Sequence, residues 1–158
     1  MNEEEKVLLV APSTLKKSIF KTETWTVIVT NKRLLFAKYS QEVFNKEVKE
    51  RREEAKAEGR NKLGQFFAQA SASFTWYTRY NNLPPDEVLK ENPENYYLSP
   101  QDVINYQLLK GKVYRDSDDI TKQDPHQLVI NSNRGKFVFT TTSDYGKLQD
   151  ALNTLFHS

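Results

Sequence analysis

The sequence predicts an α+β fold that is mainly β, because it contains two hairpin patterns and one clear helix pattern. Residues 24–39 (TWTVIVTNKRLLFAKY) are expected to form two strands that meet at a tight turn, Asn31-Lys32. β-Branched and aromatic residues dominate both arms, and Asn tolerates the left-handed backbone of a two-residue turn. Alternating segments return in residues 103–141, and apolar residues recur at helical spacing in residues 143–157.

The composition excludes several kinds of site. A chain of 158 residues fits one domain with room for an insertion. Its 23 basic and 21 acidic residues give a net charge of +2, so no strong overall field favours nucleic acid or an anionic membrane. Cysteine is absent, which rules out disulfides, thiolate nucleophiles and cysteine-bound metals.

Nothing in the sequence predicts secretion or a membrane span. The N-terminus is acidic, and the apolar run that follows it, residues 7–11, is too short for a signal peptide. No apolar run approaches the ~20 residues that cross a bilayer. We expect a whole, small polypeptide in the cytoplasm, with a peripheral membrane location as the alternative.

In the first half of the chain, the apolar run of residues 6–11 is expected to end at Pro12-Ser13, and residues 15–21 are expected to form a strand before the hairpin. The pattern then changes, because residues 41–60 contain strong helix formers and only a thin apolar stripe. Residues 62–80 are rich in aromatics and fit either one helix or a helix followed by a strand. Asp86 is expected to cap a short helix.

The second half of the chain predicts a further sheet and a terminal helix. The expected elements are an extended stretch at 96–98, strands near 103–108 and 112–114, a polar loop at 115–125, and strands around 128–130 and 137–139. The helix over residues 143–157 has Ser143 or Asp144 as its cap. Its apolar stripe is expected to bury against the open end of the sheets.

Three phrases resemble the pleckstrin-homology-like (PH-like) families, including GRAM and bacterial PH-like domains. VTNKRLLF (29–36) resembles their third-to-fourth strand turn, LSPQDVINYQL (98–108) the strand that opens the second sheet, and HQLVINSNRGKFVFTT (126–141) the last strand pair before the helix. The resemblance covers residues 6–40 and 96–157. Residues 41–95 stand where the family has a short connection, so they are interpreted as a helical insertion.

The resemblance implies one PH-like domain over residues 1–158. Its barrel would come from residues 6–40 and 96–142, as two nearly orthogonal antiparallel sheets that form a partly open barrel closed at one end by the helix 143–157. Such domains bind phosphoinositides, peptides or other proteins, and fold alone does not fix which. The TNKR turn is a structural signature of the family and implies no catalytic role.

The main expectation is a non-enzymatic binding module that docks a protein, or a second copy of itself, through the insertion. Exposed aromatics at high density indicate either an interface or packing on the chain's own barrel, and both readings stay open. The candidate partner-binding residues are Phe66, Phe67, Trp76, Tyr77, Arg79 and Tyr80. Balanced charge in this segment does not favour nucleic acid.

The alternative is a peripheral membrane module that recognises anionic lipid headgroups through a small basic cluster. In the PH-like families this cluster lies near the first strand pair, where the present chain has candidate residues Lys16, Lys17, Lys32 and Arg33. Glu23 interrupts the cluster, and the simpler interpretation is that these are solvated surface side chains.

No catalytic residue, metal or cofactor is expected. His126 and His157 lack metal-ligand spacing and a neighbouring nucleophile. Asp116, Asp118 and Asp119 lie in a loop that lacks the glycine and final glutamate of a calcium-binding loop. Phosphate-loop, dinucleotide-binding and hydrolase nucleophile motifs are also absent from the sequence.

Overall fold

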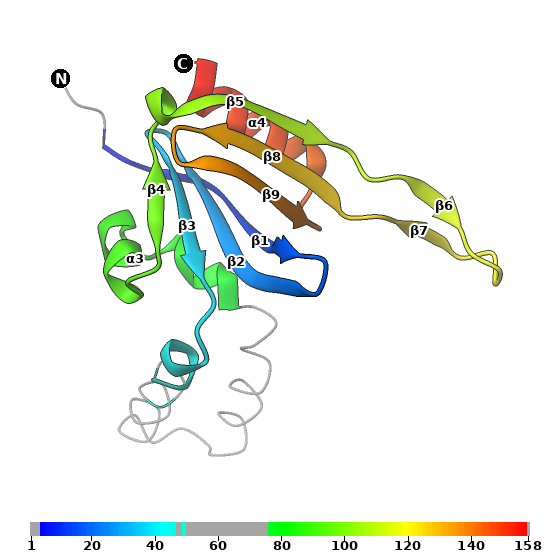
Figure 1. The fold of residues 1–158 in the computed structure, drawn as a ribbon, viewed down its shortest axis with the longest axis horizontal. Helices are drawn as coiled ribbons and strands as arrows, with labels where there is room; N and C mark the ends of the chain where they lie inside the picture. Colours follow the sequence, from blue (N-terminus) through cyan, green and yellow to red (C-terminus); the bar gives the residue numbers. More distant parts are fainter. Residues whose placement is uncertain (1–3, 47–48, 50–75, 158) are drawn as a thin grey trace.

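A computed structural model describes residues 4–46, 49 and 76–157 of the chain. As predicted, the fold is α+β and mainly β, with one large antiparallel sheet and a C-terminal helix (Figure 1). Seven strands form this sheet in the order β4-β3-β2-β1-β9-β8-β5. They are β1 (Val7–Ser18), β2 (Lys21–Thr30), β3 (Leu34–Lys38), β4 (Tyr96–Leu98), β5 (Val103–Leu109), β8 (His126–Ser132) and β9 (Gly135–Thr141).

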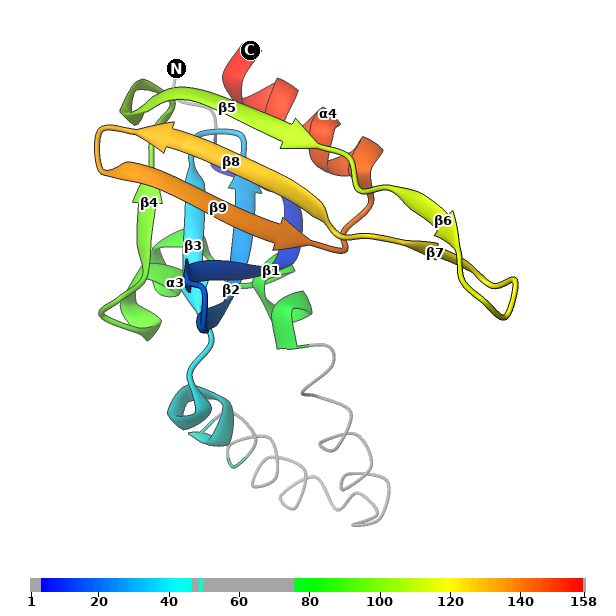
Figure 2. The ribbon, with the colours of Figure 1, turned by 45° about the vertical axis from the view of Figure 1, so that its right-hand side comes forward.

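Strand β1 joins the two halves of this sheet. It pairs with β2 over most of its length and with β9 at Ser13, Thr14 and Leu15. In Figure 2, β8 and β9 run crosswise to β2 and β3, so the sheet bends strongly at β1. The two expected sheets are therefore two halves of one continuous sheet, and its end strands β4 and β5 do not pair with each other.

The expected break at Pro12-Ser13 was wrong, because β1 runs through it without interruption. Pro12 lies opposite Thr26 of β2, and the ladder with β9 begins only at Ser13. The missing N–H of the proline therefore costs no hydrogen bond on the β9 side. The Pro12 carbonyl instead accepts a hydrogen bond from the Thr141 hydroxyl at 2.8 Å.

The main core lies between the two halves of the sheet and the helix α4 (Tyr145–His157). Phe36 of β3 is fully buried and stacks on Tyr96 and Phe139, with ring centroids 4.7 and 5.3 Å apart. The buried residues of α4 are Leu148, Ala151, Leu152 and Leu155, as the apolar stripe predicted. Asp144 caps the helix, since its Oδ1 accepts a hydrogen bond from the Lys147 amide at 2.9 Å.

A second apolar cluster lies on the other face of β1, β2 and β3. It is covered by the 3₁₀ helix η1 (Trp76–Asn81) and the helix α3 (Pro85–Glu91), which contribute Tyr80 and Val88. The strand alternative was therefore wrong for residues 76–80. The predicted cap at Asp86 was wrong as well, because Pro84 precedes the helix and Pro85 starts it without a side-chain cap.

Residues 41–46 are helical, as the sequence predicted. Apart from Lys49, the rest of the expected charged helix and residues 62–75 lie outside the described part.

Strands β6 (Val113–Arg115) and β7 (Thr121–Gln123) form a separate ribbon that projects from the body (Figures 1 and 2). The expectation of a polar loop over residues 115–125 was therefore wrong in part, because Arg115 belongs to β6 and residues 121–123 form β7.

The base of this ribbon is tightly built. The Gly111 amide donates to His126 Nδ1 at 2.9 Å, and a Cβ on Gly111 would lie only 1.9 Å from the Asp124 carbonyl oxygen. His126 is buried and packs edge-on against Tyr145, with ring centroids 5.3 Å apart. His126 therefore anchors the ribbon to the sheet and helix α4.

We predict that Phe36→Ala lowers the free energy of unfolding by about 3–5 kcal/mol, because it leaves a cavity at the centre of the aromatic stack. The matched control is Phe20→Ala, the same truncation at a position that is 98% exposed. That change should stay within about 0.5 kcal/mol of the wild type. Urea denaturation followed by circular dichroism measures both, and equal effects would contradict the assignment of the core.

Candidate functional site

The tip of the β1–β2 hairpin presents two large apolar side chains to solvent. Ile19 is 84% exposed and Phe20 is 98% exposed. They are the two residues of the turn, since Ser18 pairs directly with Lys21. Single exposed apolar residues are common on proteins, but two adjacent bulky ones at the end of a projecting hairpin form a local apolar patch.

The turn itself does not require these residues. Two-residue hairpin turns favour Asn, Asp and Gly, whose backbones tolerate positive φ. Among the described non-glycine residues only Asp119 has positive φ, so Ile19 and Phe20 adopt ordinary backbone conformations that small polar residues also reach. The apolar pair therefore contributes neither to the core nor to the turn, which indicates a role at the surface.

Lysines surround the apolar pair. Lys16, Lys17 and Lys21 are all exposed at the end of the hairpin. Lys17 lies 3.6 Å from Glu23, whereas Lys16 and Lys21 have no carboxylate partner in the part of the chain that the structure describes. The hairpin tip thus combines an exposed apolar pair with uncompensated positive charge.

Glu23 links the base of the hairpin to β3. It accepts a hydrogen bond from Trp25 Nε1 at 3.2 Å and lies 3.0 Å from Lys38, which also contacts Glu94 at 2.9 Å. Burial acts to raise the pKa of Glu23, but the hydrogen bonds from Lys38 and Trp25 and the nearby positive charges outweigh it, so the pKa is lowered. Glu23 is therefore a structural anion that holds Lys17 and Lys38.

The structure separates the four predicted headgroup residues into two groups. Lys16 pairs with Thr22 at the start of β2, whereas Lys32 and Arg33 follow Thr30 at its other end. At about 3.3 Å per residue, these positions are about 26 Å apart. The prediction of one basic cluster was therefore wrong, because proximity in sequence was taken for proximity across a long hairpin.

Arg33 is a structural residue at the β2–β3 turn. Its guanidinium donates to Glu5 through Nε and Nη2, at 2.9 and 3.0 Å, and to Asp86 at 2.9 Å. It also lies over the ring of Tyr97, 4.7 Å from the centroid. Burial opposes its charge, but hydrogen bonds to the two carboxylates raise the pKa of Arg33. Arg33 therefore ties the N-terminal segment and α3 to the turn.

The structure places the predicted partner-binding residues in different surroundings. Phe66 and Phe67 lie outside the described residues, and Trp76 begins η1. Tyr77 is half-buried against the second apolar cluster, and Tyr80 is 1% exposed with its hydroxyl 2.9 Å from Glu91. Arg79 forms an ion pair with the same Glu91 at 2.7 Å. Tyr80 and Arg79 thus serve packing within the chain.

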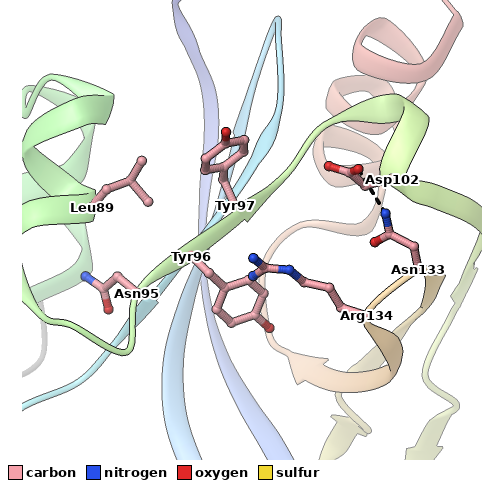
Figure 3. A pocket seen from close by; sticks show the side chains of 7 residues that line it. All are labelled: Leu89, Asn95, Tyr96, Tyr97, Asp102, Asn133 and Arg134. Atoms are coloured by element: carbon pink, nitrogen blue, oxygen red, sulfur yellow. Dashed lines mark hydrogen bonds between the residues drawn. The ribbon is translucent and has the colours of Figure 1, made fainter.

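A groove of about 640 Å³ lies between α3, β4 and the β8–β9 turn, and Figure 3 shows the side chains that line it. They are Leu89, Asn95, Tyr96, Tyr97, Asp102, Asn133 and Arg134. The Asn95 side chain accepts a hydrogen bond from the Lys38 amide and donates one to the Val88 carbonyl. Asp102 accepts hydrogen bonds from the Ser99 amide and from Asn133 Nδ2. These polar groups hold the walls in position.

The remaining groups of the groove are aromatic and cationic. The guanidinium of Arg134 lies 5.7 Å from the centroid of the Tyr96 ring and has no carboxylate partner within the described residues. The Tyr96 hydroxyl is buried without a hydrogen-bond partner there, and burial raises its pKa. Among the side chains that line the groove, no nucleophile lies beside a base.

Within the described residues, no three His, Asp or Glu side chains are grouped so as to hold a metal ion. Asp116 of the predicted polar loop instead accepts the amides of Asp118 and Ile120 and contacts Lys122 at 3.0 Å. None of the helices in the described part is both long and apolar enough to span a bilayer.

No protein-family model matches the chain, and no curated protein matches it in sequence. Among solved structures, the chain is similar to the C-terminal domain of an unknown protein from Leishmania infantum, with 7% sequence identity and a TM-score of 0.45. The match covers 98% of this chain and 86% of that one. A likeness of this size carries no information about function.

The sequence analysis missed Ile19 and Phe20 because residues 15–21 were expected to form a strand, in which these two side chains would lie on opposite faces. The available signal was the segment KKSIFK, in which an apolar pair lies between lysines. That pattern is uncommon inside a half-buried strand, where apolar and polar residues alternate. It fits a turn that directs both apolar side chains outward.

We predict that Arg33→Gln lowers the free energy of unfolding by about 1–3 kcal/mol, because it leaves Glu5 without its bidentate partner. The matched control is Lys32→Gln at the neighbouring exposed position, which should cost less than about 0.5 kcal/mol. Chemical denaturation of both variants makes the comparison. Equal stabilities of the two variants would show that the Arg33 contacts do not stabilise the fold.

We predict that the contribution of Glu23 to the stability of the fold depends on pH. Because its folded-state pKa lies below the ordinary value of 4.5, its ion pairs stabilise the fold above that pH and are lost as the pH falls through the folded-state pKa. Glu23→Gln should therefore be less stable than the wild type at about pH 6, and the difference should shrink as the pH falls below 4.5. Urea denaturation across this range tests it, and a constant difference would contradict it.

Proposed function

We propose that this chain is a non-enzymatic, PH-like module that attaches peripherally to anionic membrane surfaces through its β1–β2 hairpin. The observation that carries the proposal is the strongly exposed pair Ile19 and Phe20 at a hairpin tip that also bears exposed lysines. An apolar tip with a basic rim matches a bilayer interface, where acyl chains lie beneath anionic headgroups.

The topology supports the PH-like part of the proposal. Strands β1 to β4 form one half of the sheet, β5, β8 and β9 form the other, and a C-terminal helix packs on the core between them. This is the order of elements that the PH-like resemblance leads one to expect. The ribbon β6–β7 and residues 41–95 are additions to that plan.

The energetics support a reversible attachment. Full burial of an Ile or Phe side chain is worth about 1.5–3 kcal/mol, and each lysine near an anionic surface adds about 1 kcal/mol. With Lys16 and Lys21 as the uncompensated charges, the hairpin supplies about 5–8 kcal/mol before any cost of ordering. Such binding needs both the apolar and the basic component, as in other anchors that combine two weak signals.

Docking of a protein through the insertion stays a prediction, since most of its candidate segment lies outside the described residues. Within the described part of the insertion (residues 41–46, 49 and 76–95), η1 and α3 pack on the outer face of β1, β2 and β3. The observations therefore favour the hairpin as the first surface to test.

We predict that the wild type co-sediments with vesicles that contain about 30% phosphatidylserine and not with neutral phosphatidylcholine vesicles, and that salt weakens the binding. Ile19→Ser with Phe20→Ser should reduce the bound fraction at least about fivefold, because the apolar contribution is lost. Lys16→Glu with Lys21→Glu should do the same through the charge.

Two controls match these variants. Val113→Ser with Ile120→Ser changes exposed apolar residues on the β6–β7 ribbon, and Lys32→Glu reverses a charge at the opposite end of β2. Both should bind like the wild type. A wild type that stays in the supernatant with every vesicle, or an Ile19→Ser, Phe20→Ser variant that sediments like the wild type, would overturn the membrane proposal.

A further inference from the structure

Strand β5 (Val103–Leu109) leaves one edge of the large sheet open. It pairs with β8 on one side and is the last strand in the sheet order, so its other edge has no partner strand among the described residues. Figures 1 and 2 both show β5 at the rim of the sheet. The N–H and C=O groups along such an edge can accept another strand.

This edge has little of the usual protection against pairing. Proteins blunt exposed edges with charged residues, prolines, β-bulges or a covering segment. The sequence of β5, VINYQLL, contains neither a charge nor a proline. Ile104 is 73% exposed and Leu109 is 42% exposed, so the edge also carries apolar surface. A bulge at Ile104 is the one irregularity, and residues 105–109 pair regularly with β8.

We propose that β5 pairs antiparallel with β5 of a second copy of this chain, about a two-fold axis at Tyr106. In this register Tyr106 of one copy lies opposite Tyr106 of the other, and Asn105 of each copy lies opposite Gln107 of the other. The bulge takes Ile104 out of step, so Leu108 meets Val103, and both of these side chains already pack on the core. Antiparallel neighbours lie on the same face of a sheet, as these pairs do.

The exposed apolar residues are also matched in this register. Leu109 of one copy lies beside Ile104 of the other on the outer face, so the two most exposed aliphatic side chains of β5 cover each other. A shift of the axis by one residue, to Gln107, would set Asn105 opposite Leu109. The register about Tyr106 pairs amide side chains with each other and aliphatic side chains with each other, so we choose it over the register about Gln107.

The charges at the two ends of β5 complement each other across the same axis. Asp102 precedes the strand and Lys110 follows it. Antiparallel pairing brings Lys110 of one copy toward Asp102 of the other, twice in the dimer. The uncharged centre with opposite charges at its ends is a self-complementary surface, which a two-fold interface requires. A second copy is therefore the occupant that this edge fits.

The test is sedimentation equilibrium of two double variants that differ in one residue. Asn105→Lys with Gln107→Lys sets two lysine pairs opposite each other, and should raise the dimer dissociation constant at least about tenfold, because like charges directly opposite destabilise a sheet. Asn105→Lys with Gln107→Glu sets two opposite-charge pairs in the same positions, and should dimerise like the wild type. Both positions are exposed, and circular dichroism verifies the fold of each variant.

The absence of cysteine from the chain allows a second, independent test. Opposite residues in an antiparallel pair have Cα atoms about 4.5–5.5 Å apart, which a disulfide spans. A mixture of Asn105→Cys and Gln107→Cys chains should therefore form a crosslinked heterodimer on mild oxidation, faster than either variant alone.

Three results would overturn the proposal. One is a wild type that remains monomeric up to about 0.5 mM, which would leave the edge to a strand from another protein or to no partner. Another is a dimer that is unaffected by the lysine pair, which would place the interface elsewhere. The third is equal crosslinking of the mixture and of the single variants, which would contradict the register.

Discussion

The fold depends on strand β1 pairing along both of its edges. Its contacts with β2 and with β9 convert two crossing halves into one sheet, and the core forms where these halves face each other. The aromatic stack around Phe36 and the apolar face of α4 fill that space. Because β9 lies far from β1 in sequence, the core closes only when the whole chain has assembled.

The same closure explains which surfaces remain available for binding. Residues between the two halves of the sheet are buried, and the polar groups of the groove beside Arg134 are mostly engaged in holding β4 and the β8–β9 turn. Folding requires neither the apolar tip of the β1–β2 hairpin nor the outer edge of β5, which has no partner strand among the described residues. Each proposal therefore uses a surface that the packing of the core leaves accessible, and a membrane contact and a dimer contact do not compete for residues.

Arg33 shows that a basic residue near a predicted site need not bind a ligand. The sequence placed Arg33 in a candidate headgroup-binding cluster, but Arg33 is held between Glu5 and Asp86 and joins three segments of the chain. Neighbouring Lys32 remains exposed. A guanidinium that binds two carboxylates in fixed geometry acts as a structural connector, and it is not available for a phosphate headgroup without breaking those contacts.

The sequence by itself determined the local elements: the hairpin around Asn31-Lys32, the strands β5, β8 and β9, and the helix α4 with Ser143 or Asp144 as its cap. Alternation, turn residues and capping are short-range signals, so they could be identified without the fold. Only the tertiary structure decided that β1 continues through Pro12, that Tyr80 is core, and that Lys16 and Arg33 lie at opposite ends of β2. These facts depend on which strands pair and on what covers each face, and no local pattern encodes a partner that is distant in sequence.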